Sequence, residues 1–160
     1  FTLGTAISGR TFSPDDLRFV QDLIRLRSQH PVFCRRRWFQ GRAIHGANVK
    51  DIAWFTHDGV QMSEENWGEG FAKSLGVFIN GDTIPNPNTR GDPVTDASFY
   101  LIFNAHYEPL DFVLPGKPWG ERWMPLLETT RGWVDAAAPL HAGARMQAEA
   151  RSIILLRLDA

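Results

Sequence analysis

The residues best suited to ligand binding in this sequence are its six tryptophans. A flat indole can stack on the apolar C–H face of a sugar ring, but an indole within a strand usually belongs to the core. Trp38, Trp54 and Trp123 fall in predicted strands, so we expect core packing for these three. Trp119 follows a Gly-Lys-Pro segment in a predicted loop and is the candidate substrate-binding residue, as a sugar platform. The simpler interpretation, that Trp119 covers one end of the core, is favoured.

The sequence shows no pattern typical of metal binding or covalent catalysis. Its five histidines are scattered, never at helical or zinc-finger spacing, and a single cysteine supplies no cysteine cluster. Neither the G-x-S-x-G motif of serine hydrolases nor a glycine-rich phosphate loop is present. We therefore predict no metal site, no cofactor and no catalytic residue in this chain.

Two further sets of residues are weak candidates for catalysis. Cys34 precedes three arginines that would lower the pKa of its thiol, but no general base is assigned to it, so packing at a strand start is favoured. Glycosidase chemistry needs two carboxylates about 5–10 Å apart in a cleft. The acidic residues considered border predicted turns, where aspartate is common, and no pair is singled out: Asp51, Asp58, Asp96 and Asp111.

Charge and composition exclude several classes of partner. Seventeen basic and eighteen acidic residues give a net charge of −1. Side chains alternate across a strand, so Arg35, Arg36 and Arg37 divide between two faces, and we expect no nucleic-acid partner. No segment approaches the roughly 20 apolar residues of a membrane span, so we expect no membrane partner. The single cysteine excludes an internal disulfide and fits a reducing, cytoplasmic location.

The length and composition fit a globular chain of one domain, or one domain with a fragment of another. The sequence has 160 residues, 43% of them hydrophobic and 22% charged. Because it begins with Phe1 rather than methionine, we expect a piece excised from a longer polypeptide.

The first predicted element is a helix that begins at Pro14 and ends at His30. Ser13 is a suitable N-cap, Asp16 follows it by three residues, and Pro31 disfavours helical geometry at His30. The apolar residues of this segment span an arc of about 180° at 100° per residue: Leu17, Phe19, Val20, Leu23, Ile24 and Leu26. So broad a face suits a helix wedged between two bodies.

Arg27 lies in the middle of this apolar arc. Two interpretations stay open. Either its guanidinium is buried beside a carboxylate or carbonyl groups, or it extends to solvent over its packed stem.

After Pro31, short β-rich segments alternate with turn residues. The predicted strands are residues 36–40, 52–57, 75–80, 99–104, 110–114, 123–128 and 152–158. Residues 104–109 are expected to form a hairpin connection, and Ser63 to cap a single helical turn within a long loop. Strands without helical crossovers predict a mainly β fold, an antiparallel β-sandwich preceded by one α-helix.

Several segments in succession resemble known enzymes. Residues 23–33 resemble the last barrel helix and helix exit of the α-amylase superfamily. Asp-Ile-Ala-Trp-Phe at 51–55, followed by Asp58-Gly59, Met62 and Trp67, resembles the bacterial glycogen debranching enzymes of the isoamylase type, in glycoside hydrolase family 13. Residues 75–81, 103–106, 112–115 and 123–129 continue the same order, so the resemblance runs from about residue 17 to 158.

The resemblance implies a C-terminal fragment. Residues 1–31 would be the tail of a (β/α)8 catalytic barrel with its last helix, and residues 32–160 the C-terminal β-sandwich domain. The family's aspartate nucleophile, glutamate acid/base and second aspartate, which hydrolyse α-1,6 branch linkages of glycogen or limit dextrin, would lie upstream. None of them maps onto this chain. The implied function is a non-catalytic accessory domain that stabilises the barrel.

The resemblance also implies partners. The broad helix face would pack on the parent enzyme's barrel, with Arg27 as the buried arginine of the helix exit. Without the barrel this face would be exposed, which predicts self-association of the chain through the helix. The alternative function is an autonomous carbohydrate-binding module, in which Trp119 binds glycogen or another α-glucan.

Overall fold

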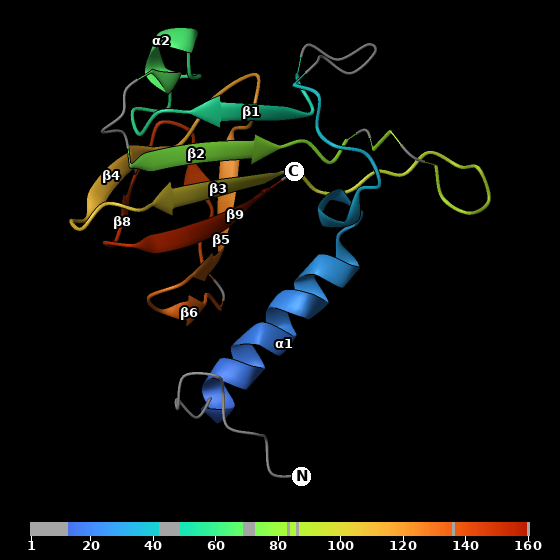
Figure 1. Cartoon of the computed structure of the whole chain (residues 1–160), viewed down its shortest axis with the longest axis horizontal. Coiled ribbons are helices and arrows are strands. Elements are labelled where there is room, and N and C mark those ends of the chain that lie inside the picture. Colours follow the sequence, from blue (N-terminus) through green and yellow to red (C-terminus); the bar gives the residue numbers. More distant parts are fainter. Residues whose placement is uncertain are drawn as a thin grey trace.

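The structure, a computed structural model, describes residues 13–41, 49–68, 73–82, 84–85, 87–135 and 137–159. Its helices are α1 (Pro14–Gln29), a short 3-10 helix η1 (Pro31–Cys34) and α2 (Glu64–Trp67). The strands in chain order are β1 (Ile52–Phe55), β2 (Ser74–Ile79), β3 (Phe99–Asn104), β4 (Leu110–Val113), β5 (Arg122–Glu128), β6 (Gly132–Trp133), β7 (Leu140–His141), β8 (Arg145–Ala148) and β9 (Ser152–Leu158). Figure 1 shows α1 diverging from the strands.

The strands form two antiparallel sheets. A seven-stranded sheet has the order β1-β2-β3-β9-β5-β6, with β7 paired to β5, and β4 pairs with β8 in a separate sheet. Every strand pair described is antiparallel. This arrangement confirms the predicted mainly β, sandwich-type fold with one preceding helix.

Helix α1 begins and ends where the sequence predicts. The Ser13 hydroxyl accepts the Asp16 N–H at 3.1 Å, and the Asp16 carboxylate accepts the Ser13 N–H at 3.0 Å, which completes a capping box. Ser63 caps the short α2 in the same way, with Asn66 as its partner. Both predicted N-caps are confirmed.

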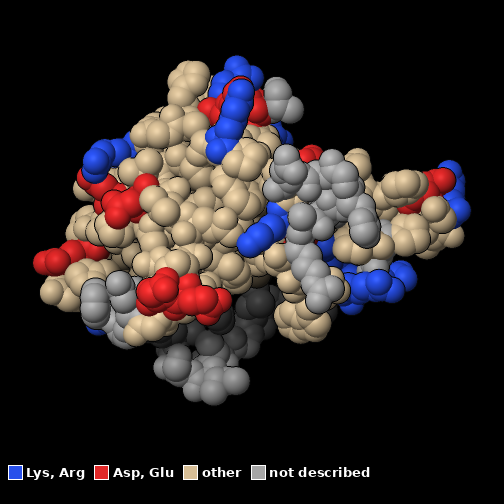
Figure 2. Space-filling view, turned by 90° about the horizontal axis from the view of Figure 1, so that it is seen from above, with Lys and Arg blue, Asp and Glu red and all other residues tan. Residues whose placement is uncertain are grey.

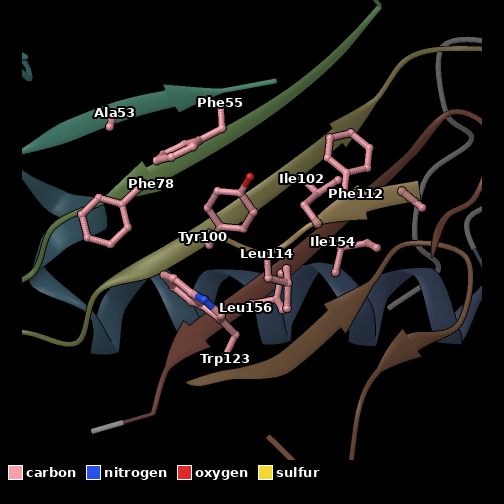
Figure 3. Close-up of a cluster of buried hydrophobic side chains, with 11 residues drawn as sticks. Ala53, Phe55, Phe78, Tyr100, Ile102, Phe112, Leu114, Trp123, Ile154 and Leu156 are labelled. Atoms are coloured by element: carbon pink, nitrogen blue, oxygen red, sulfur yellow. The ribbon is translucent and has the colours of Figure 1, made fainter. Parts of the chain in front are cut away.

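The inner core lies between the large sheet and the β4–β8 pair. Alternate residues of neighbouring strands form cross-strand rows; Ala53, for example, pairs with Phe78. Trp123 is fully buried at the centre, and its Nε1–H donates to the Pro115 carbonyl at 2.9 Å. Figure 3 shows these side chains converging, with Tyr100 above Trp123.

A second apolar cluster covers the opposite face of the large sheet. Phe99 and Leu155 point to this outer face, where Val32 of η1 joins them. The register of β5 against β9 shifts between Pro125 and Leu127, which is a bulge of one extra residue. Because of this bulge, Leu127 packs in the outer cluster although Trp123 of the same strand packs in the inner one.

The predicted hairpin at residues 104–109 is wrong. Strand β3 pairs with β2 and β9, whereas β4 pairs with β8, so the connection passes from one sheet to the other. The buried Asn104 side chain explains this corner. Its Nδ2 lies within 3.1 Å of the carbonyl oxygens of Glu108, Ala148 and Glu149, and its Oδ1 accepts the His106 N–H at 3.0 Å.

Other differences concern short strands. The predicted strand at residues 36–40 is wrong, because this segment is irregular and pairs with no strand among the described residues. Its side chains therefore do not alternate between two faces of a sheet. Strand β8 was not predicted, because only Met146 and Ala148 turn inward while Arg145 and Gln147 are exposed. Strands β6 and β7 have two residues each, too few to show a period.

Trp123 and Trp38 provide a matched test of the core. We expect Trp123→Ala to lower the free energy of unfolding by about 3–5 kcal/mol, because it removes a fully buried indole and its hydrogen bond. Trp38 is 92% exposed, so Trp38→Ala should change the free energy of unfolding by less than about 0.5 kcal/mol. Urea denaturation measures the free energy of unfolding of both variants. An equal loss in the two variants would contradict the placement of Trp123 in the core and of Trp38 at the surface.

Tyr100 provides a pH-dependent test. Its buried hydroxyl has no hydrogen-bond partner among the described residues, and a Cβ at Gly76 would collide with it. Burial raises the pKa of the phenol well above its usual value. Above about pH 10 the unfolded phenol ionises while the folded one stays neutral, so ionisation lowers the free energy of unfolding as pH rises.

We expect Tyr100→Phe to remove this contribution, so that the variant loses less stability than the parent chain between about pH 9 and 11. At neutral pH the variant should be as stable as the parent or more stable, because an unpaired buried hydroxyl is removed. The control is Tyr107→Phe, since Tyr107 is 64% exposed. Parallel curves of stability against pH for the parent chain and Tyr100→Phe would refute the raised pKa of the buried Tyr100 phenol.

Candidate functional site

The broad apolar face of α1 is divided between the sandwich and solvent. Phe19, Leu23 and Leu26 pack partly against the outer cluster, and the Phe19 ring lies 6.3 Å from that of Trp133. The remaining apolar side chains are exposed, by 39% at Leu17, 46% at Val20 and 63% at Ile24. The expected exposure of part of this face is therefore observed.

The C-terminal end of α1 is anchored through Asp96. The Asp96 carboxylate lies 2.7 Å from Nδ1 of His30 and accepts the backbone N–H groups of Val32 and Ala97 at 3.0 and 2.7 Å. Its side chain is almost fully buried. The His30 ring also packs edge-on against Phe99, with centroids 4.8 Å apart. These contacts hold the C-terminal end of α1 against the start of β3.

Arg27 takes one of its two expected positions, whereas Cys34 takes a different one. Arg27 is exposed, which agrees with the interpretation that its side chain extends to solvent and not with a guanidinium buried within this chain; the apolar arc around it is itself half uncovered. Its carbonyl oxygen lies 3.1 Å from the Cys34 thiol. Cys34 is exposed and ends η1 rather than beginning a strand.

The arginine run serves a local role. The Arg35 side chain is buried, stacks over the Phe39 ring at 4.1 Å and lies 3.7 Å from the Asp51 carboxylate. Desolvation lowers the pKa of this guanidinium, and the charge of Asp51 opposes the shift. Asp51 also accepts the N–H groups of Gln40 and Gly41 at 2.9 Å each. In the view of Figure 2, basic and acidic side chains alternate over the surface rather than forming one basic stripe.

The tryptophans divide according to tertiary packing. Trp119 is half-buried, with its ring against Phe55 and Phe78 at centroid distances of 5.3 Å, so only part of the indole faces solvent. Its sugar-binding role stays a prediction. The expected core packing of Trp38 is wrong, because this side chain is 92% exposed. Trp67, which the sequence did not single out, is 53% exposed.

The described residues offer no assembled metal centre. Among them, no three His, Cys, Asp or Glu side chains are grouped so that they could hold a metal ion. In the same part of the chain, no helix has the length and apolar character needed to span a membrane. Asp51 and Asp96, two of the weak candidates for catalysis, instead accept hydrogen bonds from backbone N–H groups.

Comparison with known proteins finds a matching family and two groups of relatives. The family described as "Isoamylase, C-terminal" matches residues 51–156. A protein of Mycobacterium tuberculosis (strain H37Rv), named "Glycogen operon protein GlgX homolog", is 40% identical over 144 residues, which cover 89% of this chain and 20% of the relative. The "Isoamylase" of Pseudomonas amyloderamosa is 24% identical over 120 residues, 75% of this chain and 13% of the relative. The chain thus spans about a fifth or less of the length of these curated relatives.

Asp96 provides a test of the helix anchor. We expect Asp96→Ala to lower the free energy of unfolding by about 1–3 kcal/mol, because the buried Val32 N–H loses its acceptor. Amide hydrogen exchange in α1 should accelerate at the same time. The control is Asp82→Ala, an exposed position in the same loop. Unchanged exchange in α1 would show that Asp96 is not the anchor.

Proposed function

Since the chain belongs to the isoamylase C-terminal family, we propose that it is the non-catalytic C-terminal accessory domain of a glycogen-debranching glycoside hydrolase. The longer enzyme hydrolyses α-1,6-glucosidic branch linkages in glycogen or limit dextrin, in the cytoplasm. Its catalytic carboxylates lie outside these 160 residues. The names of the relatives, a glycogen operon protein and an isoamylase, support this proposal.

The observation that carries the proposal is the divided face of α1. One side of the helix packs on the sandwich, while Leu17, Val20 and Ile24 form an apolar stripe without a cover among the described residues. A helix that is apolar over such an arc is suited to lie between two bodies. In this proposal, residues 1–31 belong to the catalytic barrel and residues 32–160 form the sandwich that supports it.

The chain would act by covering one side of the barrel. Burial of the exposed stripe contributes on the order of 1 kcal/mol for each half-exposed aliphatic side chain. Asp96 and His30 would transmit this support, because they fix the helix end to the sandwich. The domain therefore stabilises the catalytic body and contributes no reacting group.

The alternative is an autonomous module that binds an α-glucan through Trp119. The exposed part of this indole is the feature that supports it, whereas its packing on Phe55 and Phe78 supports the simpler structural role. Glycogen retention that is lost in Trp119→Ala would favour the module.

The helix stripe is tested in the longer polypeptide. We expect Ile24→Lys, alone and combined with Val20→Lys, to lower its thermal midpoint by several degrees and its debranching activity in parallel, because a charge would be buried against the barrel. Gln21→Lys, at an exposed polar position on the same helix, should have little effect. Equal midpoints for Ile24→Lys and Gln21→Lys would contradict the proposed interface.

The same variants test the isolated chain. We propose that without the barrel it self-associates through this stripe, so Ile24→Lys should shift its light-scattering mass toward the monomer. Ile24 is preferred to Leu23, because Leu23 also packs against the outer cluster. A monomeric parent chain whose solubility does not change in Ile24→Lys would refute self-association.

A further inference from the structure

The indole of Trp67 is exposed and yet firmly supported. Trp67 is the last residue of α2, and its ring meets that of Trp54 at a centroid distance of 5.6 Å and an angle of 76°. The capping box stabilises the single turn of α2, since the Asn66 side chain accepts the Ser63 N–H at 2.9 Å. An exposed aromatic ring with a fixed orientation is prepared to bind a flat apolar surface without an ordering cost.

Beside this indole lies a hollow of about 300 Å³, at the lower end of the size range of small-molecule sites. Its lining includes Met62, Asn66, Trp67, Lys73, Ser74 and Phe103. The Asn66 Oδ1 is used by the helix cap, and its Nδ2 makes no hydrogen bond to a described residue. The exposed Lys73 ammonium makes no ion pair within the described part of the chain. The hollow therefore combines the hydrogen-bond donors of Asn66 and Lys73 with the aromatic rings of Trp67 and Phe103.

The hollow is remote from the part of the chain that supports α1. Ile79 and Phe99, which belong to the outer cluster beneath α1, pair at one end of β2 and β3. Ser74, Leu75 and Phe103 of the hollow lie at the other end of these strands, four or five residues away, or about 14–17 Å. Figure 1 accordingly shows α2 and α1 at opposite ends of the molecule. The hollow and the exposed stripe of α1 are therefore separate surfaces of the described chain.

We propose that this hollow, named here the Trp67 site, is a surface binding site for an α-glucan chain. A glucose ring has an apolar C–H face that can stack on the Trp67 indole, and hydroxyl groups that can accept hydrogen bonds from Asn66 and Lys73. A neutral polyol suits a lining that combines two aromatic rings with amide, hydroxyl and ammonium groups. The choice of a glucan rests on the proposed function in glycogen debranching. The site would hold the polymer on the accessory domain while branch points are hydrolysed elsewhere.

The experiment uses the full 160-residue chain. Affinity electrophoresis in glycogen-containing gels and fluorescence titration with maltoheptaose measure binding of the parent chain, Trp67→Ala and Trp67→Phe. We expect Trp67→Ala to weaken binding by about tenfold or more, because it removes the apolar surface on which the sugar ring would stack. Trp67→Phe should retain most of the affinity, because a flat ring remains. Lys73→Ala, at an exposed side chain, should weaken binding severalfold without affecting the fold.

Two other tryptophans serve as matched controls. Trp38→Ala removes a more exposed indole outside the hollow and should leave binding unchanged. Trp119→Ala tests the alternative platform. Glycogen retention that persists in both Trp67→Ala and Lys73→Ala, or is lost only in Trp119→Ala, would overturn the Trp67 site. So would a parent chain that binds neither glycogen nor maltoheptaose.

The Trp67 site and the accessory-domain function can fail separately. If the chain binds no glucan while the longer enzyme hydrolyses branch linkages, the site is wrong and the accessory function stands. If the chain binds glucan through Trp67 but the longer polypeptide does not act on branch linkages, the site stands and the debranching function is wrong.

Discussion

Both faces of the seven-stranded sheet are apolar, and each needs its own cover. The inner face is closed by the β4–β8 pair, with Phe112 and Leu114 packed over Tyr100 and Trp123. The outer face has only α1 and η1 at one end among the described residues. Because an exposed apolar sheet face is unfavourable in water, the fold depends on holding this helix in place.

Helix α1, which covers the outer face, leaves part of its own apolar surface exposed, and this exposed surface links the fold to the proposed function. Asp96 ties the end of α1 to β3 through His30 and the Val32 N–H, and the stripe of Leu17, Val20 and Ile24 is exposed in this arrangement. Any cover for Leu17, Val20 and Ile24 must then come from outside the described residues. The chain spans about a fifth of the length of its mycobacterial relative, which is compatible with the proposed cover by a larger catalytic body.

Residue types that carry catalysis in other proteins have structural roles here. Asp51 and Asp96 accept backbone N–H groups, and Asn104 satisfies the carbonyl groups at the corner between the two sheets. Irregular segments leave such backbone groups unpaired, and buried polar groups need partners. The hydrogen bonds that these side chains make to the backbone explain their presence at these positions.

The local features follow from the amino-acid sequence alone: the cap at Ser13, the helix end before Pro31, and most of the long strands. These depend on neighbours within a few residues, which a single chain segment displays. The sequence also indicated the family by resemblance, and the family described as "Isoamylase, C-terminal" matches residues 51–156.

Which tryptophan is exposed and which strands pair depends on contacts that form in the tertiary structure. Trp38 and Trp123 have similar local surroundings, yet one is 92% exposed and the other fully buried. The difference arises because β5 has partners on both edges, whereas residues 36–40 have none. Likewise, Trp67 acquires its support from Trp54, thirteen positions earlier in the chain. Burial and pairing depend on contacts between distant segments, and a local pattern does not contain that information.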